Sequence, residues 1–349
     1  MLIYGRFEGV VMKIAISGFG RIGKMFLRAA VAQGAIGKDF DIVAINTRSD
    51  IKMHLHLFKY DSVFGKFEGT LEEDNGHLVV NGHKIKWVRE TDPLKLPWKE
   101  LGVDLVVEST GEFTKREDAE KHIKAGASYV LLSAPGKGVD ATIVPGVNDH
   151  ILDVKKMKII SLASCTTNCL APVLKVIDGK FGIESGFLST VHAYTNDQRI
   201  LDGSHEKDWR RARAAAVNII PTTTGAAKAI GEVLPQLNGK MDGVAFRVPV
   251  PDGSLNDMVL LLKKAASAKE INDELSRASR EELKGILEYT EEPLVSSDIV
   301  GNPHSSIVDG QLTKCIGNLA KISAWYDNEY GYSNRLVDLT RKMSKMLNK

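Results

Sequence analysis

The sequence predicts an α/β protein in which a Rossmann-type, doubly wound parallel sheet is joined to a second, α+β catalytic domain. A glycine-rich turn at Gly18–Gly23 separates a strand from a helix. Strands and helices then alternate as far as residue 132. Beyond them, Cys165 stands where another strand turns into a helix. From these observations we expect residues 1–164 and 329–349 to form the first domain, and residues 165–328 the second.

The composition is that of a globular protein. Of the 349 residues, 43% are hydrophobic and 26% are charged. A net charge of +2 gives no electrostatic support to a nucleic acid or a membrane as the main partner. Three cysteines are too few for a disulfide framework, and no His or Cys lies at metal-ligand spacing near Cys165. No metal site is therefore expected, and His122 and His150 are interpreted as surface residues.

The apolar segments indicate no attachment to a membrane, because none is long enough to span one. The first residues lack the basic flank and the long apolar stretch of a signal peptide. We interpret residues 1–11 as an extension ahead of Met12. The expected location is the cytoplasm.

The turn at Gly18–Gly23 has the spacing of a dinucleotide-binding loop. A β-prone segment at residues 13–16 precedes it, and a helical pattern follows as far as Ala30. In such a loop the first glycine permits a tight turn, the second lets the backbone approach a pyrophosphate, and the third lets the helix pack on the strand. The helix N-terminus then carries the anion. The residues expected to bind the cofactor here are Gly18, Phe19, Gly20, Arg21, Ile22 and Gly23.

The second strand, residues 41–45, ends without the acidic residue that usually holds the adenine ribose of NAD. Asn46, Thr47 and Arg48 stand there instead and are assigned to the cofactor site. Without a carboxylate a 2′-phosphate is not repelled, and Arg48 can pair with it. We therefore expect NADP, or both NADP and NAD, as the cofactor. Two alternatives stay open: Arg48 as a solvated surface charge, and Asp50 as a ligand of the ribose.

The remainder of the first domain continues the alternation. Residues 76–88 predict two short strands around an Asn-Gly turn, and residues 93–101 predict a helix. A strand at 103–108, a helix at 115–125 and a strand at 129–132 come next. Parallel sheets bind ligands at the carboxyl ends of their strands, so we assign the loops after these strands to the cofactor. These loops contribute Ser109, Thr110, Gly111 and Ser133.

Cys165 is the candidate nucleophile. Residues 158–163 predict a short strand, and apolar residues recur at helical spacing from Leu170 until Gly179 and Gly182 end the pattern. The cysteine therefore lies at a helix start, where free N–H groups and the helix dipole favour a thiolate. The alternative is that Cys165 is a small buried hydrophobic residue, as most free cysteines are.

Three segments resemble the signatures of a known family. They are Ser-Cys-Thr-Thr-Asn-Cys at 164–169, Val-His-Ala-Tyr-Thr-Asn-Asp-Gln at 191–198 and Trp-Tyr-Asp-Asn-Glu-Tyr-Gly-Tyr-Ser at 325–333. Together they closely resemble phosphorylating glyceraldehyde-3-phosphate dehydrogenase, and the likeness runs from about Lys13 to the C-terminus. The resemblance implies reversible oxidation of D-glyceraldehyde 3-phosphate by NAD(P) and inorganic phosphate to 1,3-bisphosphoglycerate. It also implies a homotetramer assembled through the second domain.

The residues support this chemistry independently. His192 ends a strand-like segment at residues 187–192 and can reach Cys165 across the fold. A cysteine with a histidine is an activated nucleophile with its base. The sulfur would add to the aldehyde, hydride would leave for the nicotinamide, and phosphate would displace the thioester. His192 would activate Cys165 and serve as base when the hydride leaves.

The resemblance also assigns the anion sites and the nicotinamide site. Ser164, Thr166, Arg211, Thr224 and Gly225 match the family's site for inorganic phosphate. Thr195, Asp197 and Arg247 match its site for the substrate phosphate. Asn328 resembles the residue that hydrogen-bonds the nicotinamide carboxamide, and Tyr332 of the same motif is assigned to the cofactor.

The chain departs from the family pattern at a few positions. The loop at residues 201–205 carries Gly-Ser where NAD-restricted members tend to have Leu-Pro, and Ser204 resembles the NADP-accepting members. Ser17 stands where Asn is frequent, and Thr91 where many members carry Arg. The likeness is therefore to the NADP-accepting kind. Two other functions stay open: erythrose-4-phosphate dehydrogenase, which has the same Cys–His pair, and nucleotide or RNA binding without catalysis.

Overall fold

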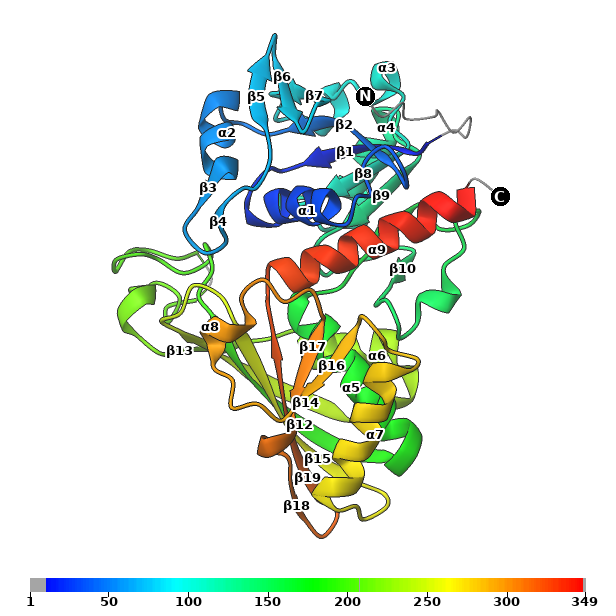
Figure 1. The fold of residues 1–349 in the computed structure, drawn as a ribbon, viewed down its shortest axis with the longest axis vertical. Coiled ribbons are helices and arrows are strands. Elements are labelled where there is room, and N and C mark those ends of the chain that lie inside the picture. The colour runs from blue at the N-terminus through cyan, green and yellow to red at the C-terminus, as the bar shows by residue number, and fades with distance from the viewer. Residues whose placement is uncertain (1–10, 207, 348–349) are drawn as a thin grey trace.

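The computed structural model describes residues 11–206 and 208–347, and contains two large β-sheets, one above the other in Figure 1. The proposed N-terminal extension falls almost entirely outside the described residues. The upper sheet is formed by the first part of the chain and the lower sheet by the second part. The expected fold class is confirmed: a doubly wound, largely parallel sheet with helices is followed by a second part that has its own sheet and helices.

The upper sheet has the strand order β10-β11-β9-β8-β1-β2-β7-β6-β5, and it is parallel from β10 to β7 and antiparallel from β7 to β5. Its strands are β1 (Lys13–Ser17), β2 (Asp41–Asn46), β5 (Leu71–Asp74), β6 (His77–Val80), β7 (His83–Val88), β8 (Leu105–Glu108), β9 (Tyr129–Leu132), β10 (Ala141–Thr142) and β11 (Ile159–Ser161). The chain order reverses between β1 and β8, so their carboxyl ends form the crevice in which such sheets bind ligands.

Helices and a short hairpin surround this sheet. They are α1 (Arg21–Ala32), α2 (Ile51–Lys59), α3 (Trp98–Leu101), α4 (Arg116–Lys124), β3 (Tyr60–Asp61) and β4 (Gly65–Lys66). The sheet is buried from both sides, since β1, β8 and β9 read as nearly continuous apolar runs. The Asn-Gly turn joins β6 to β7 as expected, with positive φ at Asn81 and Gly82.

The lower sheet has the order β13-β14-β12-β15-β19-β17-β16, with β18 paired to β19. Its strands are β12 (Ile183–Ala193), β13 (Ile220–Thr223), β14 (Met241–Val248), β15 (Ser254–Leu262), β16 (Leu287–Thr290), β17 (Ser306–Asp309), β18 (Lys314–Ile316) and β19 (Leu319–Tyr326). The helices of this part are α5 (Cys165–Phe181), α6 (Ala226–Val233), α7 (Ala268–Arg280) and α8 (Ser296–Ile299). Helices α5, α6 and α7 share one apolar core with the sheet, and alternate residues of β15 are buried against them.

The chain ends by returning to the first sheet. Helix α9 (Tyr330–Leu347) packs along α1 and runs, red in Figure 1, between the two sheets. Its apolar residues Leu336, Leu339 and Met343 join the same core as Phe26 of α1. The link between β19 and α9 also reaches the start of α1, where Glu329 pairs with Arg21, and this brings the C-terminal motif to the crevice.

Some elements differ from the expected ones. The helix expected at 93–101 is a 3-10 turn at Pro93–Lys95 followed by the short α3, because Pro97 cannot donate the hydrogen bond that would join them. Helix α5 continues through Gly179 and ends only before Gly182, which has positive φ. Within the described residues no helix is both long and apolar enough to cross a membrane.

The interpretation of His122 as a surface residue is wrong, whereas His150 is exposed as expected. His122 is fully buried on α4, where its Nδ1 accepts a hydrogen bond from Trp98 Nε1 at 3.0 Å. Its Nε2–H then donates to Glu108 Oε2 at 3.0 Å. Glu108 in turn accepts from the backbone N–H and the hydroxyl of Thr110. This network fixes the loop after β8, and its members are too far apart in sequence for the histidine's environment to be foreseen.

Candidate active site

A cleft of about 800 Å³ lies at the carboxyl ends of β1 and β8 and is lined by residues of both halves of the chain. Its lining includes these predicted site residues: Gly20, Arg21, Ile22, Ser109, Thr110, Gly111, Ser133, Ser164, Cys165, His192, Thr195, Asp197, Arg247, Asn328 and Tyr332. Lining residues that were not predicted are Ser62, Val63, Ala134, Pro135, Tyr194, Asn196, Pro251 and Glu329. We call this space the main cleft.

A second cavity of about 320 Å³, which we call the side cavity, adjoins the glycine turn on the side of β2. The predicted residues that line it are Gly18, Phe19, Gly20, Asn46, Thr47, Arg48, Ser109 and Thr110. Six predicted residues line neither space: Gly23, Thr166, Ser204, Arg211, Thr224 and Gly225. Ser204 lies on an exposed loop, where its carbonyl accepts from Arg199.

The glycine turn fits a dinucleotide pyrophosphate. Gly18 has φ +94°, and a Cβ on it would lie 2.5 Å from Thr110 N, so the loop after β8 packs directly on the turn. A Cβ on Gly23 would lie 2.2 Å from Gly18 O. Gly23 therefore lets α1 pack closely against the turn, although it lines neither cavity. A Cβ on Gly20 would have no atom within 4 Å. Gly20 is also the N-cap residue of α1, so no side chain caps this helix start. Its first N–H groups are therefore available to an anion.

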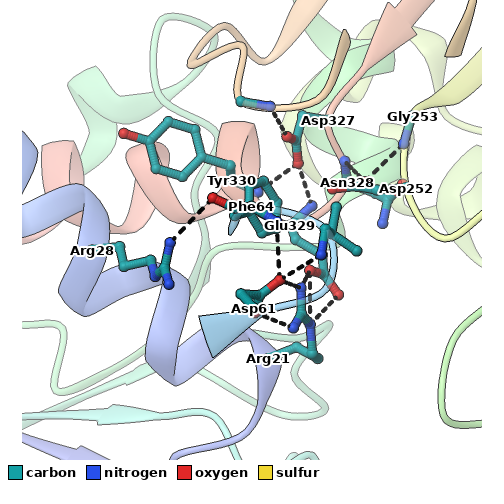
Figure 2. A network of polar contacts seen from close by, with 12 residues as sticks. Arg21, Arg28, Asp61, Phe64, Asp252, Gly253, Asp327, Asn328, Glu329 and Tyr330 are labelled. Carbon is teal, nitrogen blue, oxygen red and sulfur yellow. Dashed lines mark hydrogen bonds and ion pairs between the residues drawn. The ribbon is translucent and has the colours of Figure 1, made fainter. Parts of the chain in front are cut away.

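The side chain of Arg21 is already occupied by carboxylates. Figure 2 shows it between Asp61 and Glu329, and its Nη2 lies 2.6 Å from Glu329 Oε2. Asp327 accepts hydrogen bonds from the N–H groups of Glu329 and Tyr330, and so caps the start of α9. Arg21 thus ties α1 to the C-terminal motif, and only its backbone is left to contact a cofactor.

Local structure places Cys165 on the wall of the main cleft. Ser164 caps α5 by accepting a hydrogen bond from Thr167 N, which leaves Cys165 as the first helical residue. Ala163 just before it has φ +59°, a left-handed conformation that costs energy for any residue with a Cβ. Its carbonyl accepts from Tyr332 at 3.0 Å. This constrained turn places the Cys165 sulfur on the main cleft. The sequence does not predict the turn, because alanine rarely adopts a positive φ.

Cys165 and His192 come together as expected, with 3.5 Å between Sγ and Nε2. Burial raises the pKa of the Cys165 thiol, and the charge of Arg247 and hydrogen bonds from Thr166 oppose this only in part. Burial also lowers the pKa of His192 to about 3, assisted by the charge of Arg247. Desolvation of Cys165 therefore works against the thiolate that the start of α5 favours. Burial of the two groups thus favours the neutral thiol and the neutral imidazole.

Arg247 contacts the far side of the imidazole. Its Nη1 lies 2.6 Å from His192 Nδ1 and 3.1 Å from Ala193 O. Nδ1 itself is 2.7 Å from the same carbonyl. Nδ1 therefore has two alternative partners: it accepts from Arg247, or it donates to Ala193 O when Arg247 is engaged elsewhere. In the second arrangement Nε2 is unprotonated and faces the sulfur as a base.

Two buried residues that the sequence did not single out hold this pair in place. Tyr326 packs edge-on against the His192 ring at 5.8 Å between centroids, and its hydroxyl contacts Thr166 and Thr190 at 3.0 Å each. Ser254 donates to Asn328 Oδ1 at 2.6 Å and accepts from the N–H of the residue after His192. Asn328 is thereby oriented with its amide NH₂ group free to donate to a ligand.

The residues matched to inorganic phosphate are only partly gathered. Ser164 lines the main cleft, whereas the Thr166 hydroxyl is turned to Tyr326. Arg211 forms an ion pair with Asp197 at 2.5 Å, although the resemblance assigns these two residues to different phosphates. Thr224 accepts from the backbone at the start of α6. The groups of Arg247, Thr195 and Asp197 face the main cleft directly.

The side cavity carries several charges. Arg48 Nη2 lies 2.6 Å from Glu112 Oε2, and the Thr47 hydroxyl lies 3.3 Å from His54 Nε2. Burial lowers the pKa of Lys24 to about 8 and, with the nearby Lys24 charge, lowers the pKa of His54 to about 4. Among the described residues, no group of three or more His, Cys, Asp or Glu side chains could hold a metal ion.

The low pKa of His192 predicts a specific sensitivity to acid. Between pH 6.5 and about 3 the unfolded chain binds a proton at His192 that the folded chain does not, so the free energy of unfolding falls as the pH falls through this window. At pH 5 we expect a loss of about 2 kcal/mol from this residue relative to neutral pH. Urea unfolding of the wild type and of His192→Asn at pH 7 and pH 5 measures it. An equal pH dependence of both proteins would contradict the prediction.

Comparisons with known proteins agree over most of the chain. Residues 12–116 match the family model described as the NAD binding domain of glyceraldehyde 3-phosphate dehydrogenase. Residues 164–328 match the model of the C-terminal domain of the same enzyme.

Individual relatives are similar over nearly their full length. Glyceraldehyde-3-phosphate dehydrogenase 2 of Streptomyces avermitilis is 53% identical, over 95% of this chain and 98% of the relative. Glyceraldehyde-3-phosphate dehydrogenase 1 of Bacillus subtilis is 52% identical, over 96% of this chain and 99% of the relative. The glyceraldehyde-3-phosphate dehydrogenase of Borreliella burgdorferi is 54% identical, over 96% of this chain and all of the relative.

Proposed function

The chain belongs to the glyceraldehyde-3-phosphate dehydrogenase family and is an oxidoreductase, and we propose that Cys165 is its nucleophile and His192 its base. The observation that carries the proposal is the 3.5 Å contact between Sγ and Nε2 in a cleft that the glycine turn also lines. The proposed reaction is the reversible oxidation of D-glyceraldehyde 3-phosphate and inorganic phosphate to 1,3-bisphosphoglycerate. The nicotinamide cofactor supplies the hydride acceptor.

The first step is addition of the sulfur to the aldehyde. A new S–C bond forms, and the thiol proton passes by way of His192 to the carbonyl oxygen, which gives a hemithioacetal. The substrate phosphate would pair with Arg247, since this partly buried guanidinium lines the main cleft and forms no ion pair with a carboxylate of the described residues. His192 Nδ1 would then donate to Ala193 O, and Nε2 would become the base.

The second and third steps use the same base. His192 Nε2 takes the hydroxyl proton of the hemithioacetal as hydride leaves carbon, which yields a thioester on Cys165. An oxygen of inorganic phosphate then attacks the thioester carbon, the S–C bond breaks, the departing sulfur takes back the proton that His192 holds, and the acyl phosphate departs. Ser164 and Arg211 are the residues we propose for that phosphate. Arg211 must leave Asp197 to serve in this way.

We propose that the chain accepts NADP as well as NAD. Support comes from Thr47, which lines the side cavity where a strand-end carboxylate would repel a 2′-phosphate, and from Arg48 beside it. Residues 1–164 with 329–349 would bind the cofactor, and residues 165–328 would carry the chemistry. Asn328 would donate its NH₂ group to the nicotinamide carboxamide.

Replacing Thr47 by Asp tests the cofactor proposal. The new carboxylate should raise the Michaelis constant for NADP by about tenfold or more and that for NAD much less, because it repels only the phosphorylated ribose. Thr47→Asn, which has the same shape without the charge, is the matched control. Equal changes for both cofactors in Thr47→Asp would refute the argument.

We also propose a homotetramer in the cytoplasm. Large apolar side chains are exposed on the single chain at Phe187, Ile200, Leu201, Trp209, Val217 and Ile219. Phe187 lies on β12, and the other five lie in the segment between β12 and β13. Exposed apolar groups in this number favour association. Sedimentation equilibrium at micromolar concentration measures the mass, and a monomer would contradict this part of the proposal.

Absorbance of the reduced nicotinamide tests the function as a whole. Glyceraldehyde 3-phosphate with oxidised cofactor should give sustained reduction only when inorganic phosphate is present. Sustained reduction without inorganic phosphate would contradict the proposal that the reaction forms an acyl phosphate. Faster reduction with erythrose 4-phosphate would favour that substrate instead, and no reduction with either aldehyde would leave nucleotide or RNA binding as the better account.

A further inference from the structure

A pair of opposite charges spans the mouth of the side cavity. Arg48 follows β2 and Glu112 follows β8, and their nearest atoms are 2.6 Å apart. Both side chains line the cavity, and they are 65% and 50% exposed. An exposed ion pair of this kind is weak, so it can open when a ligand offers one member a better partner.

The other charged groups of the side cavity are less free to respond. The Glu90 carboxylate accepts hydrogen bonds from two backbone N–H groups, at 2.7 and 2.9 Å. His54 is neutral above about pH 4, since burial lowers its pKa to about 4. Lys24 is only 6% exposed and is held on α1 against the Phe19 ring. Glu112 is therefore a carboxylate of this cavity whose partner is a flexible side chain.

We propose that Glu112 sets the choice between NAD and NADP by competing with the 2′-phosphate for Arg48. The proposal rests on the function proposed above, in which the adenine ribose occupies the side cavity. In this proposal the carboxylate of Glu112, in the loop after β8, discriminates between the two cofactors. The end of β2 carries no such carboxylate.

The two forms of the ribose would meet this pair differently. A free 2′-hydroxyl can donate to the Glu112 carboxylate while Arg48 stays paired, so the ion pair is preserved. A 2′-phosphate only accepts hydrogen bonds, so it competes with Glu112 for the N–H groups of the Arg48 guanidinium. Taking Arg48 leaves Glu112 unpaired beside the phosphate, where like charges repel. Glu112 therefore lowers the affinity for NADP and leaves that for NAD nearly unchanged.

The test measures binding of ADP-ribose and of 2′-phospho-ADP-ribose by titration calorimetry at constant ionic strength, so that neither catalysis nor the nicotinamide contributes. In Glu112→Gln the dissociation constant of the 2′-phosphorylated ligand should fall about 5- to 20-fold, while that of ADP-ribose changes less than about twofold. Glu117→Gln removes the same charge from an exposed position outside the cavity and should change neither constant. Thermal unfolding of each variant checks the fold, and exposed positions should shift it little.

A double substitution separates competition from simple repulsion. In the Arg48→Gln background, Glu112→Gln should lose most of its effect on the 2′-phosphorylated ligand, because the contested guanidinium is gone. An undiminished effect there, or no change in the ratio of the two constants in Glu112→Gln alone, would overturn the inference. Failure of the wild type to bind either ligand would instead refute the proposed cofactor site, so the two failures are distinct.

Discussion

Cys165→Ser should lose activity by at least about 10³-fold while it binds the cofactor as tightly as the wild type. The serine hydroxyl is a far weaker nucleophile than the sulfur at any pH at which the protein is folded. Without a strong nucleophile at this position the acyl intermediate cannot form. The Cys165 side chain lines the main cleft at the start of α5 and is not part of the glycine turn. Loss of catalysis should therefore not disturb the pyrophosphate site.

Steady-state rates with glyceraldehyde 3-phosphate and calorimetric titration of the cofactor measure the two effects separately. Cys169→Ser is the matched control, because Cys169 lies one turn later on α5 but is fully buried and contacts Ser306 and two backbone carbonyls. It should keep most of its turnover. Residual oxidation in Cys165→Ser above about a tenth of the wild-type rate would exclude the sulfur as the acyl carrier.

His192→Asn should lower kcat by about 10²- to 10⁴-fold with little change in the affinity for cofactor, since it removes the base and leaves the nucleophile. Burial has raised the pKa of the Cys165 thiol, so a base is needed at neutral pH. Alkylation by iodoacetamide should therefore also slow at pH 7 in this variant. At strongly alkaline pH, where the thiol ionises unaided, the two proteins should react at similar rates.

Ser189→Ala is a control for a substitution on the same strand, because Ser189 lies on β12 away from the main cleft. It should alkylate like the wild type. A His192→Asn protein with wild-type alkylation at pH 7 would mean that Cys165 needs no imidazole, and the thiol–imidazole pair described here would not be the catalytic unit.

Features encoded in short stretches of sequence were predictable. The glycine turn, the hairpin at Asn81–Gly82 and the helix start at Cys165 each depend on residues within a few positions of one another. The alternation of strands and helices likewise predicted the parallel sheet and its crevice. Family motifs then located residues, such as Arg247 and Asn328, that no local pattern would have connected.

Features that depend on distant contacts were not predictable. His122 is buried because Trp98 and Glu108 satisfy both of its ring nitrogens, and only the fold brings the three together. The pKa of Cys165 is raised by burial, which only the folded chain creates. The ion pair between Arg48 and Glu112 joins the ends of strands that are separated in sequence.

The most direct measurement is the mass of the enzyme after one turnover in the absence of inorganic phosphate. The holoenzyme is mixed with glyceraldehyde 3-phosphate and oxidised cofactor, quenched in acid, digested and examined by mass spectrometry. One phosphoglyceroyl group should be found on the peptide that contains Cys165, in an amount equal to the cofactor reduced. Stoichiometric reduction with that peptide unmodified, or with the acyl group on another residue, would contradict the account.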